Sequence, residues 1–132
     1  MATIFSRIIA GEIPSYKVAE DDNFFAFLDI NPLVKGHTLV VPKKEVDYLF
    51  DIDDALLEKM MVFSKRTAKA IEKVVKCQRV GLTVIGLEVP HAHIHLIPII
   101  TGMQDMNFAN PKLKLTKEEF EETALAINKA WR

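Results

Sequence analysis

The sequence predicts an α+β fold, in which a mainly antiparallel meander sheet packs on one long helix and a second helix lies at the C-terminus. Three patterns lead to this prediction: short strand-like runs separated by turn residues, one long stripe of apolar residues at helical spacing over 53–76, and a further strand pair after it. The 132 residues and their 49% hydrophobic content are sufficient for a core without disulfides or bound metal. We expect one domain over 1–132, with its core in 3–99 and a C-terminal extension in 101–132.

The first part of the chain predicts a short helix and a β-hairpin. A helix is expected over 3–10, because Thr3 is a good N-cap and Gly11 does not continue a helix well. Two strands are expected at 16–20 and 24–28, since the Asp-Asp-Asn stretch between them is typical of a turn. These two strands are therefore expected to form the first hairpin of the sheet.

A third strand and the longest helix of the chain follow. The strand is expected over 38–41, and the helix over 53–76 with Asp51 or Asp53 as its N-cap. Thr67 is the one polar residue in the apolar stripe of this helix. The apolar positions of the stripe are Leu56, Met60, Phe63, Ala70 and Val74. We expect this stripe to pack on the apolar face of the sheet.

The remaining residues predict two more strands and a C-terminal helix. The strands are expected over 80–85 and 91–99, and Thr116 opens a capping box that begins the helix. One face of this helix is apolar and carries Phe120, Ala124, Ile127 and Trp131. The segment 101–115 is long and irregular, as functional loops often are. We interpret the extension as a capping element, and the alternative is that its methionines and Phe108 cover the active site or a dimer partner.

The composition excludes several classes of protein. The 17 basic and 18 acidic residues give a net charge of −1, which argues against binding to nucleic-acid polymers. The single cysteine, Cys77, forms no internal disulfide, and no Cys-x-x-Cys frame for zinc is present. No apolar run is long enough to span a membrane, and the first residues do not resemble a secretory signal. We therefore expect a cytoplasmic protein that does not act at a membrane.

The histidines are the unusual feature of the sequence, because three of the four fall at His91, His93 and His95. Alternate side chains of a strand share a face, so the three imidazoles are expected to flank one small site. A plain solvent-facing strand would more often carry Thr, Lys or Glu there. Two functional interpretations remain open from the spacing alone. One is a metal site, for which His-x-His is a good ligand pair, and the other is nucleophilic and acid–base catalysis.

The segment His91-Ala92-His93-Ile94-His95-Leu96-Ile97 resembles the histidine triad (HIT) motif, in which three histidines alternate with apolar residues. The resemblance extends to three further stretches, over 4–14, 25–32 and 36–43, which are similar to the Hint branch of the family. Their order is preserved over 3–99. The chain is therefore identified by resemblance as a Hint-like member of the HIT family.

This resemblance implies an α+β HIT-like fold and a homodimer that needs neither a metal nor another cofactor. The implied substrates are purine nucleoside 5′-phosphoramidates and related nucleoside monophosphate conjugates, cleaved through a covalent nucleotidyl-histidine intermediate. Three alternatives remain. The protein could cleave dinucleoside polyphosphates, as the Fhit branch does, or be a nucleotide-binding scaffold dimer with weak catalysis, or depend on a metal.

The resemblance also assigns roles to individual residues. His93 is expected to attack the α-phosphorus, His95 to contact the phosphate, and His91 and His37 to belong to the same network. Asp29 is expected to accept hydrogen bonds from the ribose hydroxyls. The other predicted nucleotide contacts are Ile4, Phe5, Ile8, Phe27, Ile30, Leu39, Glu88 and Val89. Several of the apolar members of this set are also compatible with ordinary core packing.

The sequence departs from the Hint pattern immediately before the triad. Hint-like sequences carry there a longer segment with Asn and Gly-Gln-Ser/Thr, whereas 84–90 is short and lacks amide and hydroxyl side chains. Glu88 replaces the Ser or Thr three residues before His91, and a carboxylate repels a phosphate. We predict that Glu88 faces a cationic leaving group or pairs with a histidine. The alternative is that it turns to solvent.

Overall fold

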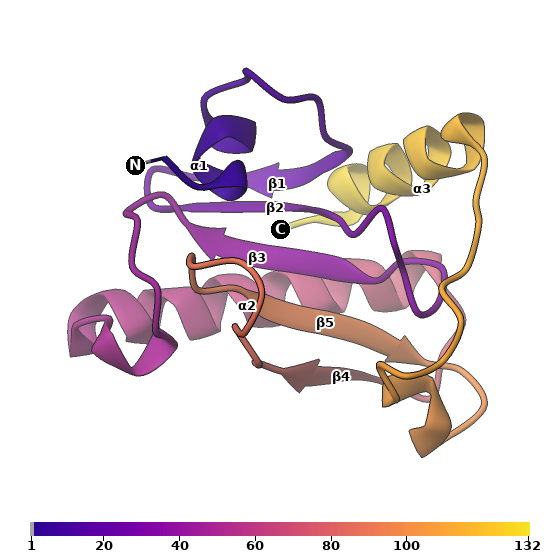
Figure 1. The fold of residues 1–132 in the computed structure, drawn as a ribbon. Coiled ribbons are helices and arrows are strands. Elements are labelled where there is room, and N and C mark those ends of the chain that lie inside the picture. The colour runs from indigo at the N-terminus through magenta and orange to yellow at the C-terminus, as the bar shows by residue number, and fades with distance from the viewer. Residues whose placement is uncertain (1) are drawn as a thin grey trace.

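The computed structural model describes residues 2–132 and has the predicted α+β architecture, built on a five-stranded antiparallel sheet (Figure 1). The strands are β1 (Lys17–Glu20), β2 (Phe24–Leu28), β3 (Thr38–Pro42), β4 (Arg79–Thr83) and β5 (Ile94–Ile99). Their order in the sheet is β1-β2-β3-β5-β4, and every neighbouring pair is antiparallel. The second hairpin is therefore inserted with β5 inside the sheet and β4 at its edge.

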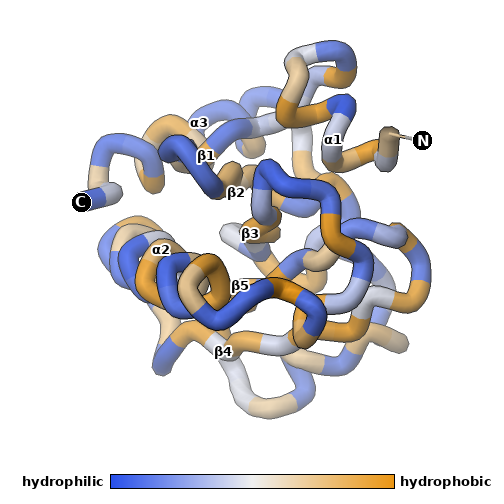
Figure 2. Tube along the Cα trace, turned by 90° about the vertical axis from the view of Figure 1, so that its left-hand side faces the viewer, coloured by the Kyte–Doolittle hydropathy of each residue, from blue (hydrophilic) through white to orange (hydrophobic). Residues whose placement is uncertain are grey.

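The helices lie on both faces of this sheet. They are α1 (Ile4–Ile9), α2 (Asp54–Val74) and α3 (Lys117–Ala130), with short 3₁₀ turns at η1 (Leu49–Asp51) and η2 (Met103–Met106). Figure 2 shows α2 and α3 on one side of the sheet and α1 on the other. No helix of residues 2–132 is long and apolar enough to cross a membrane.

Side-chain caps begin all three helices, as the sequence predicts. Thr3, Asp53 and Thr116 each accept a hydrogen bond from the backbone N–H three residues further on, at 3.0, 2.9 and 3.1 Å. At α3 the carboxylate of Glu119 accepts in return from the N–H of Thr116, which completes the predicted capping box. Each such cap stabilises its helix by about 1 kcal/mol.

Two apolar cores form because β2 and β3 are buried on both faces and send alternate side chains to each. The larger core lies between the sheet and α2 and α3, and includes Val18, Phe24, Val40, Met60, Phe63, Ile71, Ile94, Leu96 and Ile127. The smaller core lies on the opposite face under α1, and consists of Phe5, Phe25, Phe27, Leu39 and Val41. The predicted packing of the 53–76 stripe on the sheet is confirmed. Thr67, its polar interruption, donates to the Phe63 carbonyl and accepts from the indole N–H of Trp131.

The last strand begins three residues later than predicted, at Ile94 instead of His91. The backbone N–H of Ala92 donates to the carbonyl of Val46, at 2.7 Å, so this part of the chain bonds to the segment after β3 and not to the sheet ladder. Ala92 and Ile94 still point into the larger core. His91 and His93 consequently lie just before β5, and they do not have the regular strand conformation that their spacing predicts.

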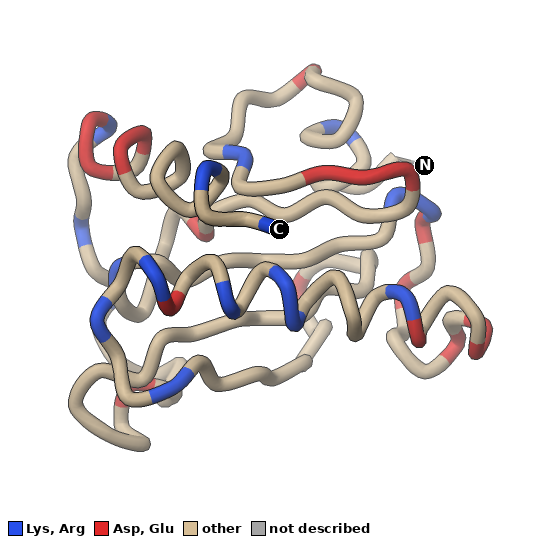
Figure 3. Tube along the Cα trace, turned by 180° about the vertical axis from the view of Figure 1, so that it is seen from behind, with Lys and Arg blue, Asp and Glu red and all other residues tan. Residues whose placement is uncertain are grey.

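The surface carries charges of both signs, in keeping with a net charge of −1. Figure 3 shows Lys and Arg interspersed with Asp and Glu along the outer side of α2.

Candidate active site

The candidate site is a cavity of about 560 Å³ on the sheet face opposite α2. Every predicted nucleotide contact lines it, together with two histidines of the triad: Ile4, Phe5, Ile8, Phe27, Asp29, Ile30, Leu39, Glu88, Val89, His93 and His95. Phe5, Phe27 and Leu39 also belong to the smaller core, so these three residues both pack in the core and line the cavity. His37 and His91 do not line the cavity and are 1% and 0% exposed.

The ring of His93 faces the cavity in a defined tautomer. Its Nδ1 lies 2.8 Å from the backbone carbonyl of His91, and because a carbonyl only accepts, Nδ1 must carry the proton. The lone pair is therefore on Nε2. The ring of Phe5 contacts the imidazole edge-on at 5.0 Å between centroids and limits its rotation. In this tautomer the imidazole of His93 has the chemical form that can attack an electrophile or accept a proton.

A chain of hydrogen bonds fixes His95 in the other tautomer, with its proton on Nε2 instead of Nδ1. The backbone N–H of Leu33 donates to Nδ1 of His37 at 3.1 Å, so the proton of His37 is on Nε2. This Nε2 lies 3.0 Å from Nδ1 of His95, which must therefore accept. His95 is left with its proton on Nε2, the nitrogen away from His37. The cavity thus has one imidazole with a bare nitrogen and one with an N–H donor.

Burial keeps His37, His91 and His95 neutral at neutral pH, because it lowers the pKa of each of these rings. Desolvation lowers the pKa of His37 to about 3, with His95 as the next cause, and lowers the pKa of His95 to about 4, with His93 as the next cause. Burial also lowers the pKa of His91. A neutral imidazole has one donor and one acceptor nitrogen, which is the condition on which the tautomer assignments depend.

Asp29 lies at the cavity wall beside His37. Burial raises the pKa of its carboxyl group, and a hydrogen bond from the N–H of Asn31, at 2.9 Å, opposes this effect. Oδ2 lies 3.6 Å from Nε2 of His37. The carboxylate is therefore placed to accept hydrogen bonds from a bound molecule.

Asp29, His37 and His95 bring three potential metal-ligand atoms within 4.8 Å of one another. The tautomers do not fit a metal ion, however. Nε2 of His37 carries a proton because Leu33 donates to the other ring nitrogen, and a ligand nitrogen needs a free lone pair. Binding would require His37 to reverse its tautomer and leave the buried N–H of Leu33 without a partner. The cluster is better described as a hydrogen-bond chain.

The segment after β5 reaches the cavity, although its composition favours a capping element and a role at the site is only the alternative. Phe108 packs edge-on against His95, with centroids 4.9 Å apart, and Lys112 lines the cavity. The N–H of Leu113 donates to the Pro32 carbonyl at 2.8 Å and holds the segment in place. The extension therefore has two parts, since α3 caps the larger core as predicted while 108–112 completes the site.

Glu88 lines the cavity and is exposed to solvent. Within residues 2–132 its carboxylate forms no ion pair with a histidine, so the predicted pairing is not seen. The other predicted role, contact with a cationic leaving group, stays a prediction. The surrounding segment 84–90 also lines the rim with Ile85 and Leu87, which are exposed apolar residues.

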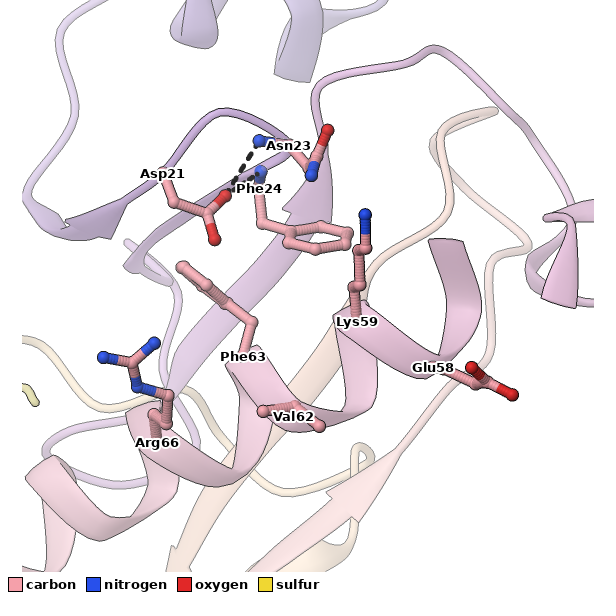
Figure 4. Close-up of a pocket in the computed structure, with 8 residues that line it drawn as sticks. All are labelled: Asp21, Asn23, Phe24, Glu58, Lys59, Val62, Phe63 and Arg66. Atoms are coloured by element: carbon pink, nitrogen blue, oxygen red, sulfur yellow. Dashed lines mark hydrogen bonds between the residues drawn. The ribbon is translucent and has the colours of Figure 1, made fainter. Parts of the chain in front are cut away.

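A second cavity, of about 410 Å³, lies on the α2 side of the sheet, between α2 and the β1–β2 turn (Figure 4). Its lining contains no histidine or cysteine and consists of Asp21, Asn23, Phe24, Glu58, Lys59, Val62, Phe63 and Arg66. The carboxylate of Asp21 already accepts the N–H groups of Asn23 and Phe24, each at 2.8 Å. This cavity offers no imidazole, so the histidine-lined cavity is the candidate active site.

Comparisons with known proteins point to one family. The HIT domain model matches residues 10–101. A Saccharomyces cerevisiae protein named adenosine 5′-monophosphoramidase is 43% identical over 99 residues, which are 74% of this chain and 62% of that protein. A Schizosaccharomyces pombe protein of the same name is 32% identical over 123 residues, 92% of each chain. The crystal structure of a Hit-like protein from Bartonella henselae superposes with a TM-score of 0.84 at 34% identity, covering 97% of this chain and 95% of that one.

Proposed function

This chain belongs to the HIT family, and from that membership we propose that it is a nucleotide-binding hydrolase of purine nucleoside 5′-phosphoramidates or related nucleoside monophosphate conjugates. The observation that carries the proposal is the pair of opposite tautomers in the cavity. His93 presents a bare Nε2 and His95 an Nε2–H, and each tautomer follows from a backbone group. One nitrogen attacks while the other donates to the phosphoryl oxygens.

The rest of the cavity has the chemistry that a nucleotide needs. The apolar side chains of Phe5, Ile8 and Phe27 supply a wall for a flat base, and Asp29 supplies an acceptor for ribose hydroxyls. Lys112 adds a positive charge to the lining, next to two carboxylates. A nucleoside with its 5′-phosphorus at His93 and its base toward α1 satisfies each of these groups.

The reaction proceeds in two displacements. In the first, the lone pair on Nε2 of His93 forms a bond to the α-phosphorus, and the amine departs with the electron pair of the P–N bond and takes a proton from water. The Nε2–H of His95 donates to a phosphoryl oxygen while charge builds on it. In the second, a water molecule attacks phosphorus, loses its proton to solvent, and returns the electron pair to His93. The products are the amine and a nucleoside monophosphate.

A second candidate function is nucleotide binding with slow turnover. The short segment 84–90 has no amide or hydroxyl side chain to hold the leaving group, and Glu88 introduces a negative charge at that end. A protein of this kind would bind adenosine monophosphate and turn over simple phosphoramidates slowly. Cleavage of dinucleoside polyphosphates is a further alternative for the same nucleophile.

Incubation with adenosine 5′-phosphoramidate, followed by intact-mass spectrometry, tests the proposal. The wild type is expected to acquire a nucleotidyl adduct and release adenosine monophosphate, and His93→Ala is expected to do neither. Circular dichroism verifies that the variant is folded. Binding of adenosine monophosphate without adduct or turnover would support the second candidate, and the absence of binding would contradict both.

A further inference from the structure

A cluster of polar groups lies behind the cavity, where three distant parts of the chain meet. One oxygen of the Glu45 carboxylate, Oε1, accepts from the backbone N–H of Thr3 at 2.9 Å and from the hydroxyl of Ser6 at 2.6 Å. Oγ1 of Thr3 lies 2.7 Å from Nδ1 of His91. We refer to Thr3, Ser6 and Glu45 as the α1 latch. The latch joins the start of α1 to the segment after β3 and to the first histidine of the triad.

Each proton in this cluster has one acceptor. Nε2 of His91 lies 2.8 Å from the carbonyl of Pro42 and must donate to it, so Nδ1 has the lone pair and accepts from the Thr3 hydroxyl. The N–H of Ser6 donates to the same Thr3 oxygen at 3.0 Å. The hydroxyl of Ser6 is 3.5 Å from His91 but 2.6 Å from Glu45, and it therefore donates to Glu45. The ring of His91 is fully buried and held on both nitrogens.

The position of His91 directly determines the orientation of His93, the proposed nucleophile. The backbone carbonyl of His91 accepts the Nδ1–H of His93, and this bond fixes the tautomer of His93. Phe5, in the first turn of α1, packs edge-on against both rings, at 5.8 Å from His91 and 5.0 Å from His93. A movement of His91 or of α1 would therefore change the direction of Nε2 of His93.

The helix itself depends on this anchorage. α1 has six residues, too few for an isolated helix to be stable in water, so its position must come from tertiary contacts. Its side chains Ile4, Phe5 and Ile8 line the cavity. The latch and the aromatic contacts therefore fix the position of α1, which forms the wall proposed for the base, relative to His93, the proposed nucleophile.

We propose that Glu45 is a positioning residue of the active site: through the Thr3 and Ser6 segment it holds His91, and through the His91 carbonyl it sets the tautomer and direction of the His93 nucleophile. Glu45 does not line the cavity, so it acts through the residues that it holds. The proposal rests on the function proposed above, since it concerns the same nucleophile. It adds a group 48 positions before His93 in the chain, for which the sequence has no motif.

Two pairs of variants separate positioning from general stabilisation. Thr3→Val removes the hydroxyl and keeps the shape of the side chain, whereas Thr3→Ser keeps the hydroxyl. Glu45→Ala removes the acceptor, whereas Glu45→Gln keeps one acceptor oxygen. Thr116→Val is the matched control for a lost helix cap, and Glu20→Ala is the control for a lost carboxylate that accepts from neighbouring lysines away from the cavity.

Two measurements are made on each variant: kcat and KM with adenosine 5′-phosphoramidate, and the imidazole tautomers by ¹⁵N NMR of histidine-labelled protein. We expect Thr3→Val and Glu45→Ala to lower kcat about tenfold, the effect of one misplaced group, with a smaller change in KM. We expect a mixed tautomer at His93 in both. Thr3→Ser and Glu45→Gln should restore the wild-type values, and both controls should retain kcat and the tautomer although Thr116→Val lowers Tm.

Unchanged kcat and an unchanged His93 tautomer in Thr3→Val and Glu45→Ala would overturn the inference. So would an equal loss of kcat in Thr116→Val, because the effect would then follow stability and not position. If the wild type forms no adduct and has no turnover, the proposed function fails instead. The tautomer measurement still decides the inference in that case, because it requires no substrate.

Discussion

Replacement of His37 by leucine is expected to reduce both stability and turnover, because two buried hydrogen bonds depend on this one ring. Its Nδ1 accepts from the N–H of Leu33 at 3.1 Å and its Nε2 donates to His95 at 3.0 Å, both in buried surroundings. Leucine leaves each partner buried without a bond, at about 1–3 kcal/mol apiece, so the free energy of unfolding should fall by about 2–6 kcal/mol. His95 then loses the contact that places its proton on Nε2, and kcat should fall at least about tenfold.

Urea unfolding and steady-state kinetics with adenosine 5′-phosphoramidate measure the two effects separately. His37→Gln is the matched control, because its amide has an acceptor oxygen for Leu33 and a donor nitrogen for His95. It should keep most of the stability and most of the turnover. Equal losses in His37→Leu and His37→Gln, or no loss in either, would refute the role of the hydrogen-bond chain.

Three further predictions follow from the same site. In the folded state the pKa of His37 is lowered to about 3 and that of His95 to about 4, from the ordinary histidine value of 6.5. Below pH 6.5 the unfolded chain therefore binds more protons than the folded chain. Stability should therefore be full above pH 6.5 and fall toward pH 4, as urea unfolding over that range measures, and a flat profile would contradict the assigned burial. Glu88→Gln and Glu88→Ser should lose activity on lysyl phosphoramidates more than on neutral amine phosphoramidates, and equal activity across the series would exclude a cationic leaving group. The resemblance to the HIT family implies a homodimer, and exposed Leu82 on the edge strand and exposed Met61 and Val62 on α2 offer apolar surface for it; we predict that analytical ultracentrifugation detects twice the mass of the chain.

The sequence predicts most of the fold because its patterns are local. The short apolar runs of β2 and β3, the apolar stripe of α2 and the caps at Thr3, Asp53 and Thr116 are each visible within a few residues. The order of β4 and β5 in the sheet is not local, and it depends on which edge of β3 the second hairpin meets. The later start of β5 has the same origin, since Ala92 bonds to Val46 across the fold.

The candidate site likewise has features that the sequence predicts and features that it does not. The predicted residues that line the cavity come from the stretches that resemble the HIT family and from the segment 84–90, and it is the resemblance that predicts their proximity. The chain of bonds from Leu33 through His37 to His95 is not visible in the sequence, because a backbone N–H has no residue signature. Phe108 is predicted to cover the site only as an alternative, and Lys112 is not predicted at all, because nothing but the length of the irregular segment 101–115 distinguishes it.

The most direct test of the account is to locate the nucleotidyl group after reaction with adenosine 5′-phosphoramidate. The protein is trapped during turnover, digested, and sequenced by tandem mass spectrometry under conditions that preserve phosphorus–nitrogen bonds. We predict that the adduct lies on His93, whose ring lines the cavity and whose Nδ1 donates to the His91 carbonyl, which leaves the lone pair on Nε2. An adduct on His95 or His91 in the wild type, or hydrolysis with no adduct on any histidine, would contradict it.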